Sequence, residues 1–203
     1  GDVATLRRAA KIITGPGQVG LPVTEIRTAS EALEVPPRCI PVLPVLQAPE
    51  LVQVGVISAS AGRMAADCVT WAARAALRGD IAALVTAPLH KEALAAAGVD
   101  FPGHTELLQA EAAAHLGRPV QEVPVRMMLA NDELKTVLVS IHLSLREAIA
   151  AVTTDNVLQT LRLTHEFLLH TSTPGQTRRR IGVAGLNPHA GEGGLFGREE
   201  LDI

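Results

Sequence analysis

Residues 58–86 read SASAGRMAADCVTWAARAALRGDIAALVT, and this stretch decides the fold class. Ser58 or Ser60 is suited to cap a helix that runs to about Arg78, and Gly79 is suited to end it. Residues 81–86 then form a short apolar run typical of a buried strand. A helix followed at once by such a strand predicts an α/β protein in which helices flank a parallel or mixed sheet.

The same alternation continues on both sides of this stretch. We predict helices at residues 5–12, 58–78, 89–97, 104–116, 145–152 and 154–170, and strands at residues 81–86, 125–130, 136–141 and 181–186. Prolines in residues 38–46 and 51–56 suit edge strands or connectors, and residues 171–180 read as a surface loop. We therefore expect sheet-rich segments at about residues 1–57 and 125–203, and a helix-rich segment at about residues 58–124.

The composition excludes several classes of protein. Hydrophobic residues make up 47% of the chain and aromatic residues only 2%, so Ala, Val, Leu and Ile must fill the core. A formal net charge of −3 without a basic block disfavours nucleic-acid binding. Cys39 and Cys68 are too few for a disulfide framework, which fits a cytoplasmic protein. No apolar stretch approaches the roughly 20 residues that span a bilayer, so we expect no membrane partner.

Two histidines stand at matched places in this pattern. His142 follows the predicted strand at residues 136–141, and His189 follows the predicted strand at residues 181–186 by three residues. The carboxyl ends of strands line the ligand crevice of open α/β sheets. Two imidazoles there could converge on one divalent ion such as zinc or cobalt. The alternative is that each is a turn histidine with an ordinary hydrogen bond.

The run GLNPHAGEGG at residues 185–194 strengthens the metal interpretation of His189. Pro188 restricts Asn187 and itself, so the approach to the histidine is stiff. The glycines that follow permit positive φ and a close approach of backbone to ligand. Asn187 and Glu192 are therefore candidate contacts to substrate or phosphate. A mobile glycine-rich loop is the competing interpretation.

Two other turns carry candidate binding residues. FPGHTE at residues 101–106 presents His104 and the Thr105 hydroxyl at a helix N-terminus, where unpaired amides favour anions. Thr105 could instead act only as the helix cap. TAPLHK at residues 86–91 places Lys91 at a strand-to-helix turn, where it could pair with a phosphate or remain a solvated surface charge.

These motifs, taken in order, resemble successive blocks of the 4-hydroxythreonine-4-phosphate dehydrogenase family of pyridoxine biosynthesis. The matching blocks are TAPLHKEALAAAGVDFPGHTE at residues 86–106, RMMLANDELKTVLVSIHLSLR at 126–146 and RIGVAGLNPHAGEGGLFGREELD at 180–202. The opening GDVATLRRAA also looks like the family's GDPxLL segment, so the resemblance covers essentially the whole chain.

The resemblance implies a fold, a reaction and cofactors. It implies an isopropylmalate-dehydrogenase-like α/β fold of two domains, working as a homodimer with the active site near the subunit interface. It implies NAD- or NADP-linked, metal-dependent oxidation of 4-phosphohydroxy-L-threonine followed by decarboxylation. The divalent ion would be zinc, magnesium, cobalt or a similar metal. No G-x-G-x-x-G fingerprint is present, so we do not expect a Rossmann cofactor site.

The resemblance also assigns residues. His142 and His189 match two of the family's three metal histidines, and His104 and Thr105 match substrate-binding residues. The third metal histidine lies in a Tyr-His-Asp-Gln segment that this chain does not contain. The family's N-terminal GDPAGIGPE segment and its downstream substrate-binding Lys, Asn and Arg are also missing. We therefore expect this chain to be the central part of one dehydrogenase unit, a fragment that lacks N- and C-terminal parts of the family.

One departure leaves the substrate open. The alanine-rich stretch AEAAAHLGRPVQEVP at residues 110–124 looks longer than in the biosynthetic enzymes. Longer versions occur in relatives that act on four-carbon sugar-acid phosphates or on the cis-dihydrodiol of terephthalate. A metal-dependent hydrolase using the His142 and His189 site, or a non-catalytic domain that keeps the scaffold, are the competing classes.

Overall fold

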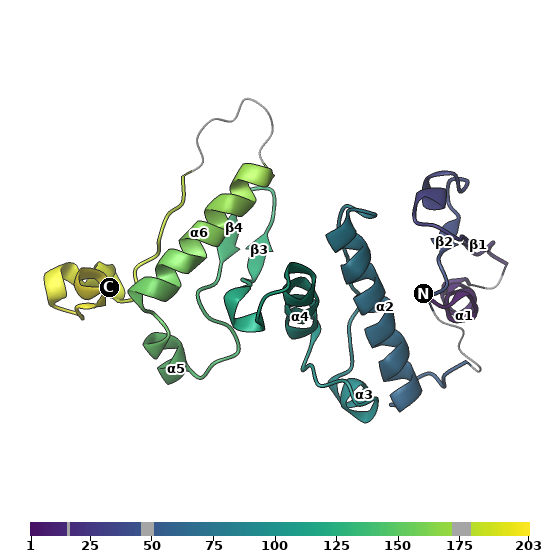
Figure 1. The fold of residues 1–203 in the computed structure, drawn as a ribbon, viewed down its shortest axis with the longest axis horizontal. Coiled ribbons are helices and arrows are strands. Elements are labelled where there is room, and N and C mark those ends of the chain that lie inside the picture. The colour runs from purple at the N-terminus through teal and green to yellow at the C-terminus, as the bar shows by residue number, and fades with distance from the viewer. Residues whose placement is uncertain (16, 46–50, 172–179) are drawn as a thin grey trace. The chain divides into compact units, whose positions relative to one another are not determined.

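The computed structural model of the 203-residue chain describes residues 1–15, 17–45, 51–171 and 180–203 (Figure 1). The chain divides into two compact units, Gly1–Pro124 and Val125–Ile203. Among the described helices, none is both long and apolar enough to cross a membrane. The predicted surface loop at residues 171–180 lies almost wholly outside the described residues.

The first unit begins with a capped helix beside a small parallel sheet. Helix α1 (Val3–Ile13) starts where the Asp2 carboxylate accepts the Thr5 amide at 2.7 Å, which satisfies one free donor of the first turn. Strands β1 (Val23–Glu25) and β2 (Ile40–Val42) pair in parallel. The 3-10 helix η1 (Ser30–Leu33) lies between them in the chain. The predicted helix at residues 5–12 is thus confirmed, and the predicted extended segment at residues 38–46 contains β2.

After β2, the regular elements described in the first unit are helices. Helix α2 (Ala59–Arg78) packs against α3 (Lys91–Ala96) and α4 (His104–Leu116), followed by the 3-10 helix η2 (Val120–Glu122) (Figure 1). Ser58 caps α2 through its hydroxyl and Gly79 ends it in the left-handed conformation, which confirms both predicted boundaries, and Gly117 ends α4 in the same conformation. Between these helices Leu94 and Leu107 are almost fully buried.

The second unit joins a hairpin to helices. Strands β3 (Met128–Ala130) and β4 (Lys135–Val137) are antiparallel, and the Asn131 side chain accepts the amides of Glu133 and Leu134 in the turn between them. Helices α5 (Leu145–Ala150) and α6 (Thr154–His170) follow, both confirming the prediction. Arg126 donates to Thr160, Asn156 and Gln159, and so links the segment before β3 to α6. The unit ends with the 3-10 helix η3 (Pro188–Gly194) and α7 (Glu199–Asp202).

The predicted strands at residues 81–86 and 181–186 are wrong for this structure. Within the described part of the chain, neither segment has a backbone partner in a ladder. Val85 is 94% exposed and Val183 is 66% exposed. A strand of a sheet exists only through hydrogen bonds to a neighbouring strand, so an apolar run without such a neighbour does not form one. The described strands form two separate pairs, β1 with β2 and β3 with β4, in a mixed α/β fold.

Candidate active site

The turn after Leu186 has a backbone of the opposite hand to an ordinary helix. Within η3, the five residues from His189 to Gly193 have φ of 53°, 51°, 74°, 42° and 65°. Three of them, His189, Ala190 and Glu192, carry side chains. An L-residue in this conformation costs about 1–2 kcal/mol, so the run holds about 3–6 kcal/mol of backbone strain. Such strain persists only where the surroundings fix the conformation, and it gathers at functional sites.

One carboxylate fixes the segment that leads into this turn. Glu200 Oε1 accepts the backbone amides of Leu186 at 2.8 Å and of Asn187 at 2.7 Å. The Asn187 side-chain amide donates to Glu200 Oε2 at 3.0 Å and to Glu199 Oε2 at 2.6 Å. The hydrogen bonds from the Asn187 side chain and backbone, aided by the Leu186 amide, lower the pKa of Glu200 from 4.5 to about 2. The carboxylate therefore stays ionised in this position.

Glycines let the turn lie close to this carboxylate. A Cβ atom at Gly191 would lie 2.8 Å from Glu200 Oε2 and 2.8 Å from the Gly197 carbonyl oxygen. A Cβ atom at Gly197, where φ is 138°, would lie 2.6 Å from Asn187 Nδ2. Only glycine fits at these two positions without displacing polar partners.

His189 stands on the outer side of the turn. Its ring lies against Phe196, with 5.8 Å between the ring centroids and 35° between the planes. The residue is exposed, and within the described residues neither ring nitrogen takes part in a hydrogen bond. The imidazole is therefore oriented from one side and open on the other.

His142 shares the unusual backbone of His189. Its φ is 57°, it is exposed, and it lies in the same unit. Only five non-glycine residues in the described chain have positive φ, and they are Arg38, His142, His189, Ala190 and Glu192. Histidine visits this region more readily than most residues, yet the coincidence of both predicted metal ligands with strained backbone favours a functional role.

The donor set fits a metal ion only in part. Two open imidazoles suit zinc, cobalt and related ions. Across the described residues, however, no group of three or more His, Cys, Asp or Glu side chains could hold an ion. A zinc site needs three or four protein ligands, so a ligand from elsewhere is required to complete it.

His104 and Thr105 open helix α4 in the other unit. Gly103 occupies the N-cap position, so Thr105 lies inside the helix and the interpretation of Thr105 as the cap is wrong. His104 Nε2 is buried and has no hydrogen-bond partner in the described part of the chain. A buried polar atom left unpaired costs about 1–3 kcal/mol, which favours a partner that the chain itself does not supply.

The remaining candidates differ in their surroundings. Lys91 is exposed at the start of α3 and makes no ion pair with any described residue. Glu192 is exposed on the left-handed turn. Asn187 is committed to Glu199 and Glu200, so its side chain supports the turn in this structure.

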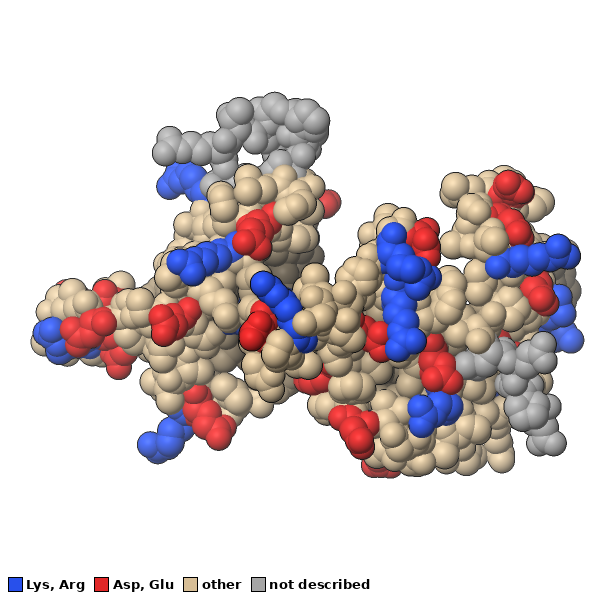
Figure 2. Space-filling model, viewed as in Figure 1, with Lys and Arg blue, Asp and Glu red and all other residues tan. Residues whose placement is uncertain are grey.

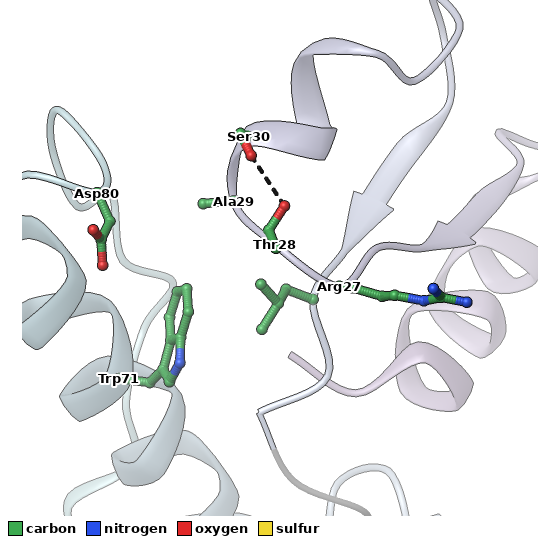
Figure 3. A pocket seen from close by; sticks show the side chains of 7 residues that line it. Arg27, Thr28, Ala29, Ser30, Trp71 and Asp80 are labelled. Carbon is green, nitrogen blue, oxygen red and sulfur yellow. Dashed lines mark hydrogen bonds between the residues drawn. The ribbon is translucent and has the colours of Figure 1, made fainter.

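Two hollows in the first unit do not contain these residues. One, of about 390 Å³, lies in the first unit between η1 and α2, with Trp71 and Asp80 facing Thr28 and Ser30, whose hydroxyls are 3.0 Å apart (Figure 3). The Arg27 guanidinium extends away from Trp71 (Figure 3). A second, of about 510 Å³, adjoins α1. On the face shown in Figure 2, charged side chains of both signs are interspersed.

The sequence did not reveal three residues that support the left-handed turn. Glu199, Glu200 and Phe196 lie beyond the GLNPHAGEGG run, and Glu200 is 13 positions from Asn187. An acidic pair at residues 199–200, shortly after the glycine-rich motif, is the only local signal, and it equally fits an ordinary first helical turn.

Known proteins match this chain over most or all of its length. Residues 1–203 match the family described as pyridoxal phosphate biosynthetic protein PdxA. A 4-hydroxythreonine-4-phosphate dehydrogenase of Beijerinckia indica is 50% identical over 150 residues, which are 74% of this chain and 41% of the relative. A D-threonate 4-phosphate dehydrogenase of Salmonella typhimurium is 40% identical over 208 residues, covering 100% of this chain and 58% of the relative.

Solved structures show the same fold. A 4-hydroxythreonine-4-phosphate dehydrogenase from Klebsiella pneumoniae matches 100% of this chain and 57% of its own, with a TM-score of 0.81 and 34% identity. A terephthalate 1,2-cis-dihydrodiol dehydrogenase from Burkholderia xenovorans matches the same shares with a TM-score of 0.57 and 28% identity. The chain thus spans little more than half of these proteins. It belongs to the pyridoxal phosphate biosynthetic protein PdxA family.

Proposed function

We propose that the chain is part of an NAD-linked, metal-dependent dehydrogenase that oxidises the secondary alcohol of 4-hydroxythreonine 4-phosphate, with decarboxylation of the product. The observation that carries this proposal is the family match over residues 1–203, which includes every candidate residue. Relatives named for this activity reach 50% identity. As a wider proposal, we expect the isopropylmalate-dehydrogenase-like fold and a cytoplasmic homodimer with the site near its interface.

Each candidate residue has a role in this proposal. His142 and His189 would hold the divalent ion together with a third ligand from outside this chain. The ion would stabilise the negative charge that develops on the substrate oxygen. His104 would donate or accept a hydrogen bond to the substrate through its unpaired Nε2 atom. Thr105, at the same helix start, would bind an anionic group of the substrate. NAD or NADP would accept the hydride.

D-threonate 4-phosphate is the second candidate substrate, and one observation favours it. The relative named for that substrate matches all of this chain at 40% identity. The cis-dihydrodiol alternative has weaker support, because the relative named for it superposes less closely, with a TM-score of 0.57. Both phosphorylated substrates carry a secondary alcohol and a phosphate, so the same residues would serve either.

An assay of the full-length protein separates these substrates. The protein is supplied with NAD or NADP, a divalent ion and each candidate in turn, and NADH or NADPH formation is followed by absorbance. We expect the highest kcat/KM with 4-hydroxythreonine 4-phosphate. Metal-dependent ester cleavage without NADH from any hydroxy acid would instead establish the hydrolase alternative.

Substitution of His189 tests the metal assignment. His189→Ala should abolish both metal binding and turnover, because it removes one imidazole ligand. The matched control is His165→Ala, since His165 is an exposed histidine on α6 outside the candidate site. A His189→Ala protein that retains metal and activity would refute the assigned role.

A further inference from the structure

We propose that Glu200 is a positioning residue that holds the left-handed turn, and thereby aims His189 at a divalent cation. The inference rests on the proposed function, because it concerns the same metal site. Glu200 itself does not contact the ion in this proposal. The carboxylate acts through the backbone on both sides of His189.

Glu200 first holds the backbone on the N-terminal side of His189. Its Oε1 atom accepts two consecutive backbone amides, those of Leu186 and Asn187. Pro188 follows directly, and its ring fixes its own φ. The Asn187 carbonyl then accepts the Ala190 amide at 3.1 Å, which closes the turn around His189. The direction of the His189 backbone is therefore set by a residue far along the chain.

The same carboxylate also meets the backbone on the C-terminal side of His189. Gly191 approaches Glu200 Oε2 so closely that a Cβ atom there would lie 2.8 Å from it. Glu200 thus accepts hydrogen bonds from the residue two positions before His189 and lies close to the residue two positions after it. A carboxylate in this place opposes displacement of the backbone that enters the turn.

Asp202, a neighbouring acid on the same helix, provides the contrast. It also lies on α7, but it pairs with Arg198 at 3.0 Å in an exposed i, i+4 ion pair. It makes no hydrogen bond to the turn among the described residues. If Glu200 only stabilised α7, loss of Asp202 would have a similar effect. If Glu200 positions His189, its removal will weaken metal binding whereas removal of Asp202 will not.

The experiment compares Co²⁺ affinity in the intact protein and three variants. Metal-free wild type, Glu200→Ala, Glu200→Gln and Asp202→Ala are titrated with Co²⁺ and followed by visible absorption, after circular dichroism has established that each is folded. Hydrogen exchange of peptides covering residues 186–194 is measured in parallel. Both readouts are independent of turnover.

We expect Glu200→Ala to weaken Co²⁺ binding by about 10–100-fold, the usual effect of losing a group that orients a metal ligand. Exchange at the Leu186 and Asn187 amides should become faster. Glu200→Gln keeps one acceptor oxygen and should lie between wild type and Glu200→Ala. Asp202→Ala should match wild type in both measurements.

Several results would overturn the inference. Wild-type Co²⁺ affinity in Glu200→Ala does so even if exchange becomes faster, because Glu200 would then be only structural. If Glu200→Ala does not fold, unchanged affinity in Glu200→Gln has the same meaning. A wild-type protein that binds no Co²⁺ contradicts the metal assignment of the proposed function and the inference with it. Co²⁺ binding that depends on Glu200 in a protein that forms no NADH contradicts the proposed function alone.

Discussion

Gly191 lies between the Glu200 carboxylate and the Gly197 carbonyl, whereas Gly193 faces open space. Both have positive φ, of 74° and 65°, so an alanine at either position carries a similar backbone cost of about 1–2 kcal/mol. Only at Gly191 does the added methyl group also meet two oxygen atoms. Comparison of an alanine variant at each position therefore separates the cost of backbone strain from the cost of the steric clash.

We predict that Gly191→Ala lowers the free energy of unfolding by about 1–3 kcal/mol more than Gly193→Ala does, the usual cost of overpacking. The measurement is urea unfolding of both variants and wild type, followed by circular dichroism. Equal losses in the two variants would show that the turn is not pressed against Glu200.

Protonation of Glu200 should weaken the same turn. The folded protein holds the pKa of Glu200 at about 2, below its ordinary value of 4.5, so the folded state binds the proton less readily than the unfolded state. The stabilisation is then complete above pH 4.5 and is lost as the pH falls from 4.5 to about 2. We predict that the free energy of unfolding falls less over this pH range in Glu200→Gln than in wild type. The measurement is the urea midpoint of each protein as a function of pH. Identical pH profiles for that variant and wild type would contradict the prediction.

At the residue scale, the sequence marks candidate residues but does not reveal their backbone conformation. GLNPHAGEGG marks His189 because the proline before the histidine restricts the backbone, whereas the glycines after it allow positive φ. The left-handed run through His189, Ala190 and Glu192 could not be predicted, because two of these residue types disfavour it and contacts with α7 impose it. The partnership of Asn187 with Glu200 likewise depends on how the chain folds back.

At the element scale, Gly62 sets how closely α2 approaches α3. A Cβ atom at Gly62 would overlap the Ala93 carbonyl. Alanine is the better helix former by about 0.5–1 kcal/mol, but overpacking a close contact costs about 1–3 kcal/mol. The steric cost therefore outweighs the gain in helix propensity.

We predict accordingly that Gly62→Ala destabilises the first unit, seen as a lower Tm by circular dichroism. Gly15→Ala is the matched control, because the nearest atom to its Cβ would be 3.7 Å away on the Gln18 side chain. A Tm for Gly62→Ala at or above that of wild type would show that the helices separate without cost.

The helices were predictable from their ends, and the strands only in part, since β3 and β4 overlap predicted strands at residues 125–130 and 136–141. Ser58 with Gly79, and Gly117 after α4, mark boundaries through local hydrogen bonds that sequence spacing reveals. A strand depends on a partner that can lie anywhere in the chain. The apolar residues 81–86 and 181–186 therefore carried the pattern of strands without forming them here.

At the scale of the whole molecule, the two units differ in how they bury apolar side chains. The buried hydrophobic residues that the structure describes all lie in the first unit. In the second unit Val183 is 66% exposed and Leu195 is 73% exposed. Exposed apolar surface of this kind marks places where other protein normally packs.

We predict that the 203-residue polypeptide, expressed alone, binds the apolar dye ANS and self-associates as its concentration rises. Val85→Ser should reduce the dye fluorescence without changing helix content, because Val85 is 94% exposed. Fluorescence as low as that of a compact control protein, with a constant monomeric mass in light scattering, would contradict this prediction.

The turn that carries His189 also has a consequence for chirality. Its backbone follows the mirror image of the path that L-amino acids prefer, so the enantiomer of alanine would fit position 190 without the strain that L-alanine bears there. A semisynthetic protein with D-alanine at that position would keep the contacts with α7 and be more stable. In the candidate active site, the L configuration of residue 190 is therefore unfavourable for the backbone conformation that the fold requires.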